Sequence, residues 1–438
     1  MNTNSDKPKL RILCISPLFA PRAGAEAFCG NKMVRALREA GASVTVLSSE
    51  TVWFDGATDD SHIWDSLGKS IDVPTPSHSN LLRSAVMASR FQTPFYARWI
   101  GRAVDAAAAL HSLTPFDLVY SRSVPSVAHM AGFWCARKFG LPWIANFNDP
   151  WIFNFFLERG QSMGYAAPAG TDTAYPKLSG LETRAQHFWL KRTLQKADLI
   201  TYPCKGLHDF HTSLANFDHA AEIVPHIGYR PEGPIRDPNG EFRLVHAGTL
   251  GASEVTGRSP KALLIGLEAF IKSTPDAATR AKLVFVGPED KDTQTLVCEL
   301  GLQKNVQFVG KVNYEVSLDH IFSASACLLI EANMDQGIFF PSKLADYIAC
   351  GKPILSLSPR NGTVADLASR GELMRVDHDP EAVKNAITML YTEFKGGTLS
   401  SRNPSDQLQT ELQARSVAKK FLTAYQSLTS KPRKRQSS

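Results

Sequence analysis

The chain has 438 residues, of which 43% are hydrophobic and 21% charged, a balance typical of globular proteins rather than disordered chains. This length predicts more than one domain, because a single hydrophobic core rarely extends over so many residues. The net charge of +6 includes the four cations Lys431, Arg433, Lys434 and Arg435. The rest of the chain is therefore only mildly basic, which argues against a nucleic-acid partner.

The sequence also bears on the compartment. Its first nine residues are polar, and no apolar stretch is long and uncharged enough for a signal peptide or a membrane helix. The cysteines occur singly, without a Cys-x-x-Cys pair, at Cys14, Cys29, Cys135, Cys204, Cys298, Cys327 and Cys350. This spacing favours buried free thiols over disulfides or a metal site. We therefore expect a cytoplasmic protein.

In the first half of the chain, short runs rich in Val, Ile and Leu alternate with helical patterns. Strands are predicted at residues 10–16, 43–48, 116–121, 142–146, 199–202 and 222–225. Helices are predicted at residues 26–40, 94–113, 126–139 and 181–197. Near-continuous apolar strands joined by helices are typical of a parallel sheet that helices cover on both faces.

A segment rich in Pro and Gly interrupts this pattern, and we expect a linker at residues 230–240. The alternation then restarts, with strands predicted at residues 242–247, 282–286, 306–309, 327–330, 354–357 and 373–376. A helix at residues 408–428 and a disordered basic tail at 429–438 should follow.

The predicted fold class is therefore α/β, with two βαβ Rossmann-like lobes and a C-terminal helix after the second lobe. The lobes should span residues 1–229 and 241–407. Open parallel sheets bind ligands beyond the carboxyl ends of their strands, so we expect the two lobes to face each other across a cleft.

Three segments resemble ligand-binding turns. Gly24 follows the first strand and precedes a helix, where a backbone without a side chain can approach a ligand closely. In the second lobe, Gly248 and Thr249 follow a strand, and Arg258 stands before the next helix. Gly24 on its own is equally well explained as a simple turn residue.

The segment 337–353 carries the strongest pattern. A loop rich in Gly and Pro leads into a helix at Ser342, so that the amides of Ser342 and Lys343 would lie in its first turn beside the lysine ammonium. Such an arrangement suits a diphosphate. Asp346, one turn further on, could accept hydrogen bonds from ribose hydroxyls. An amphipathic helix with a solvated Lys and Asp is the simpler alternative.

Together these segments resemble the retaining glycosyltransferases of family 4, which have the GT-B fold. The resemblance covers nearly the whole chain and rests on residues 23–26, 120–129, 142–151, 196–204, 223–228 and 341–353. It implies transfer of a sugar from a nucleotide-sugar donor to a glycan or lipid-linked acceptor. Surface-polysaccharide biosynthesis is the implied role, the first lobe binds the acceptor, and no cofactor is needed.

The resemblance also implies roles for residues of the second lobe. Lys343 and the Ser342 amide would hold the donor diphosphate, with Gly24, Gly248 and Thr249 lining the donor site, and Arg258 would neutralise the leaving diphosphate. Asp346 would bind the ribose.

Two positions depart from the family pattern. Thr249 stands where many members have an arginine, and Ile338 stands where the family's first donor-site glutamate is expected. Glu331, Asp335 or Gln336 are the nearby residues that could replace that glutamate.

For the first lobe, the resemblance assigns Glu26 and His129 to the acceptor and places Asn148 and Asp149 near the reacting atoms. Asn148 would act by hydrogen bonding, and Asp149 would orient or deprotonate the acceptor hydroxyl. Asp149 is equally well explained as a helix cap, and His129 as a packed core residue.

The sequence Asp377-His378-Asp379 spells a metal-binding pattern of a different glycosyltransferase fold. Because Pro380 follows directly, Asp379 is better explained as a helix N-cap, and no metal site is expected.

Two other classes of protein were weighed. A nicotinamide dehydrogenase would need a G-x-G-x-x-G turn, which is absent. A non-catalytic GT-B subunit that binds a nucleotide or a partner enzyme fits the departures at Thr249 and Ile338. The aromatic residues of segments 91–99 and 151–156 and the basic tail suggest weak peripheral contact with the inner face of a membrane. Packing within the lobe explains the aromatic residues equally well.

Overall fold

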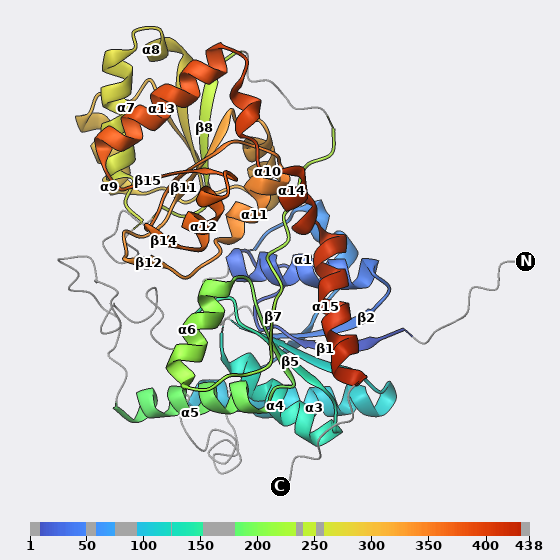
Figure 1. Cartoon of the computed structure of the whole chain (residues 1–438). Helices are drawn as coiled ribbons and strands as arrows, with labels where there is room; N and C mark the ends of the chain where they lie inside the picture. The colour runs from blue at the N-terminus through green and yellow to red at the C-terminus, as the bar shows by residue number, and fades with distance from the viewer. Residues whose placement is uncertain are drawn as a thin grey trace, which may run out of the picture. The chain divides into compact units, whose positions relative to one another are not determined.

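The structure is a computed structural model, and it describes residues 9–49, 58–74, 94–123, 125–151, 180–233, 240–250 and 258–430. The described chain forms two compact α/β units (Figure 1). The first unit runs to Pro225 and takes up the chain again from Ala414, and the second unit spans His226–Gln413. Two units with parallel sheets confirm the predicted fold class.

The first sheet has seven parallel strands in the order β3-β2-β1-β4-β5-β6-β7. Their bounds are β1 Arg11–Ile15, β2 Ser43–Ser49, β3 Ile71–Val73, β4 Leu118–Arg122, β5 Trp143–Asn146, β6 Leu199–Tyr202 and β7 Ala221–Ile223. All the strands predicted in this half are present. The pattern missed β3 because this strand has only three residues, of which two are exposed.

Helices cover this sheet. They are α1 Ala25–Glu39, η2 His62–Leu67, α3 Pro94–Leu113, α4 Val127–Phe139, α5 Gly180–Lys196, α6 Lys205–Ala215 and α15 Ala414–Thr429. Helices α1 and α15 pack together, and α3 and α4 form a second pair (Figure 1).

The second sheet has six parallel strands in the order β10-β9-β8-β11-β13-β15. They are β8 Phe242–Ala247, β9 Ala281–Val286, β10 Val306–Gly310, β11 Ala326–Ile330, β13 Ile354–Leu357 and β15 Met374–Val376. A separate two-stranded sheet joins β12 Gln336–Gly337 to β14 Asn361–Gly362. It was not predicted, because two-residue strands carry no periodic pattern.

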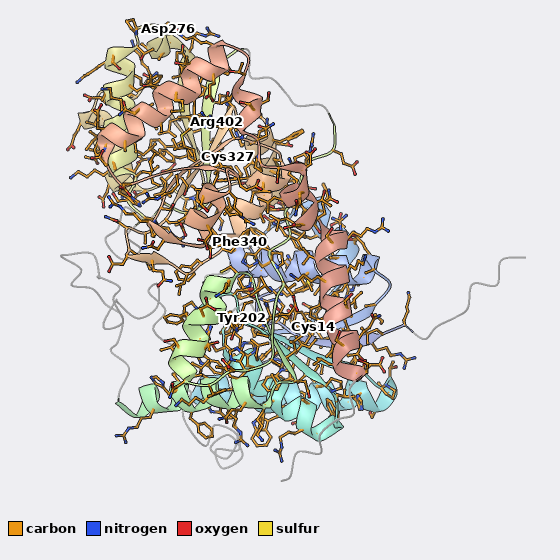
Figure 2. The ribbon with its side chains drawn as sticks, viewed as in Figure 1. Cys14, Tyr202, Asp276, Cys327, Phe340 and Arg402 are labelled. Carbon is orange, nitrogen blue, oxygen red and sulfur yellow. The ribbon has the colours of Figure 1, made fainter. Side chains whose placement is uncertain are left out.

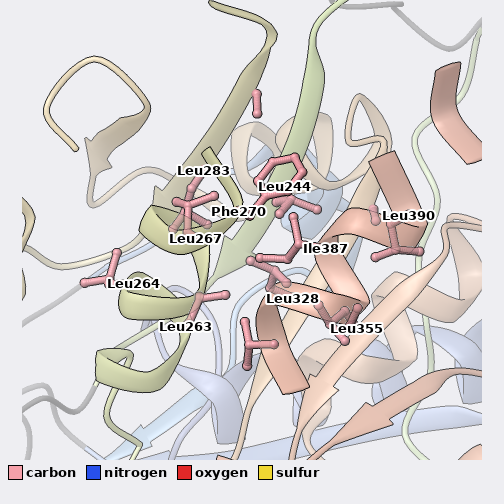
Figure 3. Packing of buried hydrophobic residues seen from close by; sticks show 14 of the residues in the cluster. Leu244, Leu263, Leu264, Leu267, Phe270, Leu283, Leu328, Leu355, Ile387 and Leu390 are labelled. Carbon is pink, nitrogen blue, oxygen red and sulfur yellow. The ribbon is translucent and has the colours of Figure 1, made fainter. Parts of the chain in front are cut away.

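The helices of the second unit are α7 Lys261–Ser273, α8 Ala277–Arg280, α9 Lys291–Glu299, α10 Tyr314–Phe322, α11 Ser342–Ala349, α12 Thr363–Ser369, α13 Pro380–Lys395, η3 Leu399–Arg402 and α14 Asp406–Glu411. A hydrophobic cluster of the second unit lies between the sheet and the helices α7 and α13 (Figure 3). These two helices approach closely, since a Cβ at Gly266 would lie 2.7 Å from the Pro380 carbonyl oxygen.

The boundary between the units differs from the predicted linker. The chain from His226 onward already belongs to the second unit, because Gly228 packs directly on α11, where a Cβ would lie 2.1 Å from the Ala345 carbonyl oxygen. The Gly228 amide also donates to the carbonyl of Leu412 at 3.0 Å. Residues 234–239 of the predicted linker lie outside the described residues.

The predicted terminal helix 408–428 is in fact two helices, α14 and α15, which belong to different units. Helix α15 packs on the first unit through Phe421, whose side chain is fully buried and whose ring centroid lies 4.8 Å from that of Tyr120. An amphipathic pattern shows that a helix has a buried face but not which domain covers it. Residues 431–438 of the predicted tail lie outside the described residues.

All seven cysteines are free, and six of them are buried, as expected. Cys14 lies within the first sheet and Cys327 within the second (Figure 2). Cys298 is the exception: it lies in the last turn of α9 and is exposed. Among the described helices, none has the length and hydropathy of a membrane span.

Candidate functional site

The second unit presents a group of charged residues where its strand order reverses. The neighbouring strands β8 and β11 are followed by connections that lead away in opposite directions, so their carboxyl ends form the edge at which parallel sheets bind ligands. Gly248 follows β8, and Glu331 follows β11. Lys343, in the first turn of α11, reaches the same edge, where its Nζ lies 3.2 Å from Nε2 of His246.

Gly248 makes room for this lysine. Its φ of 107° lies in a region that other residues rarely adopt, and a Cβ there would lie 2.9 Å from the Lys343 Nζ. The absence of a side chain at Gly248 thus leaves room for the lysine ammonium. Thr249, the next residue, is exposed, and Ser342 begins α11 half-buried.

The surroundings of Lys343 weaken its charge. Burial, and then the positive charge of Arg258, lower the pKa of the ammonium to about 7. A second cation in the same site thus opposes full protonation of the lysine. A bound anion would reverse this effect, because an opposite charge nearby favours the charged form of a lysine. The sequence prediction that Lys343 and Arg258 share one site is consistent with their electrostatic contact.

Next to Arg258 lies a hollow with an empty volume of about 260 Å³, open solvent included. Arg258 and Glu331 line it, and its other lining residues are Ala332, Met334, Gly337, Phe339 and Pro359. Burial raises the pKa of Glu331 to about 7, although the charge of Arg258 acts in the opposite direction. Its Oε2 has no hydrogen-bond partner among the described residues. Glu331 is therefore a buried carboxyl group available to a hydroxyl donor.

The structure separates the three residues that could replace the missing family glutamate. Ile338, at the expected position, is a buried apolar residue with 3% exposure. Asp335 and Gln336 are exposed. Glu331 alone of the three lines the hollow beside Arg258.

Asp346 is placed differently from the prediction. Only 4% of it is exposed, and its Oδ1 accepts hydrogen bonds from the Tyr229 amide and the Tyr314 hydroxyl, each at 2.9 Å. We expected this carboxylate to face an open ligand site. The spacing along α11 places it one turn after Lys343, but the chain at Tyr229 and helix α10 cover it, and sequence spacing does not contain that information.

In the first unit, Glu26 lies in the first turn of α1 within a hydrogen-bonded network. Its Oε2 accepts from the Asn148 side-chain amide at 2.6 Å, and its Oε1 lies 3.4 Å from Nη2 of Arg122. Arg122 in turn donates to the Tyr120 hydroxyl at 2.7 Å. These residues follow the ends of β4 and β5 and begin the helix after β1, again where the strand order reverses.

The other site residues predicted for this unit differ in how deeply they are buried. Gly24 precedes α1 with a φ of 130° and is exposed, as a turn residue should be. Asp149 is half-buried after β5. His129 is fully buried, which favours the packed core role that the sequence left open over a contact with the acceptor.

The environment of His129 is that of a core residue. Its Nδ1 lies 2.9 Å from the Ser121 hydroxyl, and its ring packs 4.5 Å from that of Phe147. Burial lowers its pKa to about 3, and the nearby His211 and Arg122 add to this effect. A neutral histidine packed among aromatic rings is a core residue, which is the alternative that the sequence left open.

The Asp377-His378-Asp379 sequence is not arranged as a metal site. Asp379 caps α13, with its carboxylate accepting from the Ala382 amide at 2.8 Å, as predicted. Asp377 pairs with Arg360 at 2.6 Å and also with Arg375. The part of the chain that the structure describes contains no cluster of three His, Cys, Asp or Glu side chains suited to a metal.

Sequence reasoning missed His246 and Arg122. Both lie inside or at the end of strands, where buried polar residues have no pattern that distinguishes a functional group from a core residue. Arg122 is 3% exposed and His246 is 1% exposed. Their position near the carboxyl end of a predicted strand was the available signal.

The comparisons with known proteins agree with this architecture. Residues 24–226 match the family model described as "Glycosyl transferase 4-like domain", and residues 260–395 match "Glycosyl transferases group 1". Together the two models cover most of the chain, and the first one ends at residue 226, where the second unit begins. A search of curated protein sequences finds no significant match.

Solved structures share the fold at low sequence identity. Sucrose-phosphate synthase from Thermosynechococcus elongatus is 15% identical, with a TM-score of 0.63, covering 96% of this chain and 100% of its own. HepE from Anabaena, solved with UDP and glucose, is 12% identical with a TM-score of 0.62, covering 95% of this chain and 100% of its own. The lipopolysaccharide outer core galactosyltransferase WaaB is 13% identical, with a TM-score of 0.58 and coverage of 95% and 99%. These likenesses confirm the predicted GT-B fold.

The burial of Asp346 predicts a structural effect. Replacing Asp346 by Ala should leave the Tyr229 amide and the Tyr314 hydroxyl without their shared acceptor, at about 1–3 kcal/mol for each buried group. We expect urea unfolding to show a clear loss in the free energy of unfolding of Asp346→Ala. The exposed Asp335→Ala, on the same connection, should stay within about 0.5 kcal/mol of wild type. Equal stability of the two variants would contradict this placement of Asp346.

Glu331 predicts a pH-dependent effect. Its pKa rises from 4.5 in the unfolded chain to about 7 in the folded protein, so folding becomes less favourable as pH rises through this range. Glu331→Gln cannot ionise, and its stability relative to wild type should increase by about 1–3 kcal/mol between pH 5 and pH 8. Unfolding at both pH values measures this. The exposed Glu289→Gln serves as control, and a pH-independent difference for Glu331→Gln would refute the raised pKa.

Proposed function

This chain belongs to the glycosyltransferases of the GT-B superfamily, and we propose that it is a retaining enzyme that works without a metal ion. In this proposal the second unit binds a nucleotide-sugar donor, and the first unit binds the acceptor. The observation that carries it is the pair of cations, Lys343 and Arg258, at the strand-order reversal of the second sheet. Two cations beside the first turn of α11 suit a diphosphate.

The charge that develops on the leaving diphosphate is central to the proposed mechanism. Arg258, Lys343 and the amides at the start of α11 would stabilise it electrostatically, which replaces the role that a metal ion has in other transferases. The acceptor hydroxyl would then attack the sugar on the face that the diphosphate leaves. No enzyme nucleophile is needed for this route, and none is assigned.

Two carboxyl groups have proposed roles around the sugars. Glu331 lines the hollow beside Arg258, and it would accept a hydrogen bond from a hydroxyl of the donor sugar. In the first unit, Glu26 would bind an acceptor hydroxyl, held in place by Asn148 at 2.6 Å. Asn148 would then act through Glu26, and Asp149 would orient or deprotonate the attacking hydroxyl.

We also propose that the acceptor is a glycan or lipid-linked sugar used in polysaccharide assembly in the cytoplasm, at the inner face of a membrane. One structural neighbour is a lipopolysaccharide outer core galactosyltransferase, and this likeness supports such a class of acceptor. The cations of the tail, Lys431 to Arg435, would give weak and salt-sensitive contact with an anionic surface, at about 1 kcal/mol each.

Nucleotide binding tests the donor site. A thermal-shift screen of UDP-, GDP-, ADP- and dTDP-sugars should identify the donor, and slow hydrolysis of that donor should accompany binding. Lys343→Ala should weaken its affinity by about 1–3 kcal/mol in titration calorimetry, because a hydrogen bond to a charged group is lost. The exposed Lys311→Ala should bind as wild type does. Unchanged affinity in Lys343→Ala would contradict the donor site, and binding without any hydrolysis or transfer would favour a non-catalytic subunit.

Metal independence is tested separately. Transfer or donor hydrolysis should continue at an unchanged rate in excess EDTA, because the proposed diphosphate partners are side-chain cations and backbone amides. Loss of activity in EDTA and its recovery with Mn²⁺ would contradict the mechanism. Arg360→Ala, which removes one partner of Asp377 at the protein surface, should not create a metal requirement.

A further inference from the structure

We propose that His246 is a positioning residue, which holds the Lys343 ammonium over Gly248 as a neutral hydrogen-bond acceptor. The inference rests on the proposed donor site and deepens it. It assigns to one buried side chain the task of fixing the lysine where a diphosphate would arrive, and it implies that binding of the diphosphate is coupled to uptake of a proton.

The hydrogen bonds of His246 determine which ring nitrogen carries the hydrogen. Its Nδ1 lies 3.1 Å from the carbonyl oxygen of Leu328, on the neighbouring strand β11. A carbonyl oxygen only accepts hydrogen bonds, so Nδ1 must carry the hydrogen and donate it. In the neutral ring, Nε2 is then an acceptor, and the Lys343 Nζ lies 3.2 Å away from it. The hydrogen bond to the backbone of β11 thus fixes the tautomer in which the Nε2 lone pair of His246 points to the lysine.

The site around this pair restricts the lysine further. Gly248 leaves the space that the ammonium occupies, since a Cβ there would lie 2.9 Å from Nζ. The His246 ring is 1% exposed and packs edge-on to Phe285, with ring centroids 6.1 Å apart. The ring cannot turn toward solvent without breaking its bond to Leu328. Lys343 therefore has a fixed partner in His246 and lies against the backbone of Gly248.

A purely structural role would not require this histidine. An apolar side chain fills a strand position in a core without the cost of burying two ring nitrogens. One nitrogen is satisfied inside the sheet by Leu328, while the other contacts the lysine at the ligand-binding edge. Packing in the core would not explain the contact between Nε2 and the Lys343 ammonium.

The charges that face the pair come from three elements. Burial and the positive charges of Lys343 and Arg258 lower the pKa of His246 well below its usual value, although the carbonyls of Leu328 and Thr249 act in the opposite direction. Burial and Arg258 lower the pKa of Lys343 to about 7. Burial also raises the pKa of Glu331, after β11, to about 7, and the charged group that acts on Glu331 is Arg258. Near pH 7, His246 is thus neutral and Lys343 is only partly protonated.

A diphosphate bound beside Lys343 would favour the protonated ammonium and raise the pKa of the lysine again. The complex then binds more protons than the free protein, so a proton is taken up from solution. By linkage, the affinity for the diphosphate should fall as the pH rises from about 7 toward 9. A lysine that is permanently charged would give no such dependence.

Titration calorimetry tests these consequences with one of UDP, GDP, ADP and dTDP, chosen as the one that stabilises the wild-type protein most. Measurements at pH 8 in two buffers of different ionisation enthalpy should show proton uptake by wild type. Lys343→Arg, whose guanidinium stays charged, should show at least a twofold smaller uptake. Equal uptake by both proteins would overturn the coupling to Lys343.

Three proteins separate positioning from packing. His246→Leu, which fills the space but accepts no hydrogen bond, should bind the diphosphate about tenfold more weakly and bind the corresponding nucleoside as wild type does. His246→Gln keeps an acceptor and should stay within about threefold of wild type. Parallel losses for the diphosphate and the nucleoside, or no rescue by Gln, would reduce His246 to a packing residue.

A measurement without ligand keeps the inference testable if no nucleotide binds and the donor site itself fails. Nitrogen-15 NMR of the histidine rings, assigned by comparison with His246→Gln, reports which ring nitrogen is protonated. His246 should be neutral with its hydrogen on Nδ1 throughout pH 5–8. A hydrogen on Nε2, or a protonated ring at pH 6, would overturn the proposed arrangement even with the donor site intact.

Discussion

The reversal of strand order in a parallel sheet is the constraint on which both candidate sites depend. Two neighbouring strands there send their connections to opposite faces, which leaves the carboxyl ends of the strands open. In the second unit this edge brings together residues from β8, the end of β11 and the start of α11, which are far apart in sequence. In the first unit the same geometry joins Glu26, after β1, to Arg122 at the end of β4. The topology of the sheet thus determines where a polar site can form, whichever residues occupy it.

Much of this framework follows from local sequence patterns. The predicted strands are present within a few residues, because apolar β-branched runs fit a sheet buried on both faces. The cap at Asp379 was also predictable, since a cap involves only neighbouring residues. Short strands such as β12 and β14 escaped, as two residues carry no periodicity. The position of α15 escaped for a different reason: its apolar face indicates burial but does not identify the unit that covers it.

The candidate site was predictable to a lesser extent, and Asp346 shows why. Its spacing from Lys343 on α11 is correct, but Tyr229 and Tyr314 bind its carboxylate from outside the helix. The converse holds for His246, whose sequence context is an ordinary buried strand and whose partners, Leu328 and Lys343, lie 82 and 97 residues away. The relative positions of residues within one helical turn can be predicted from the sequence. Residues whose roles depend on distant segments cannot.

The balance of charge in the second unit bears on how such a site handles an anion. A fully charged lysine beside Arg258 would repel it in a half-buried setting, and this repulsion is part of why the pKa of Lys343 lies near 7. The cost of holding two cations together is therefore largely avoided in the free protein, and in the proposed function a bound anion would restore the proton of the lysine. The same reasoning applies in reverse to release. Once the anion has left, the lysine could lose its proton again, which would relieve the repulsion between Lys343 and Arg258.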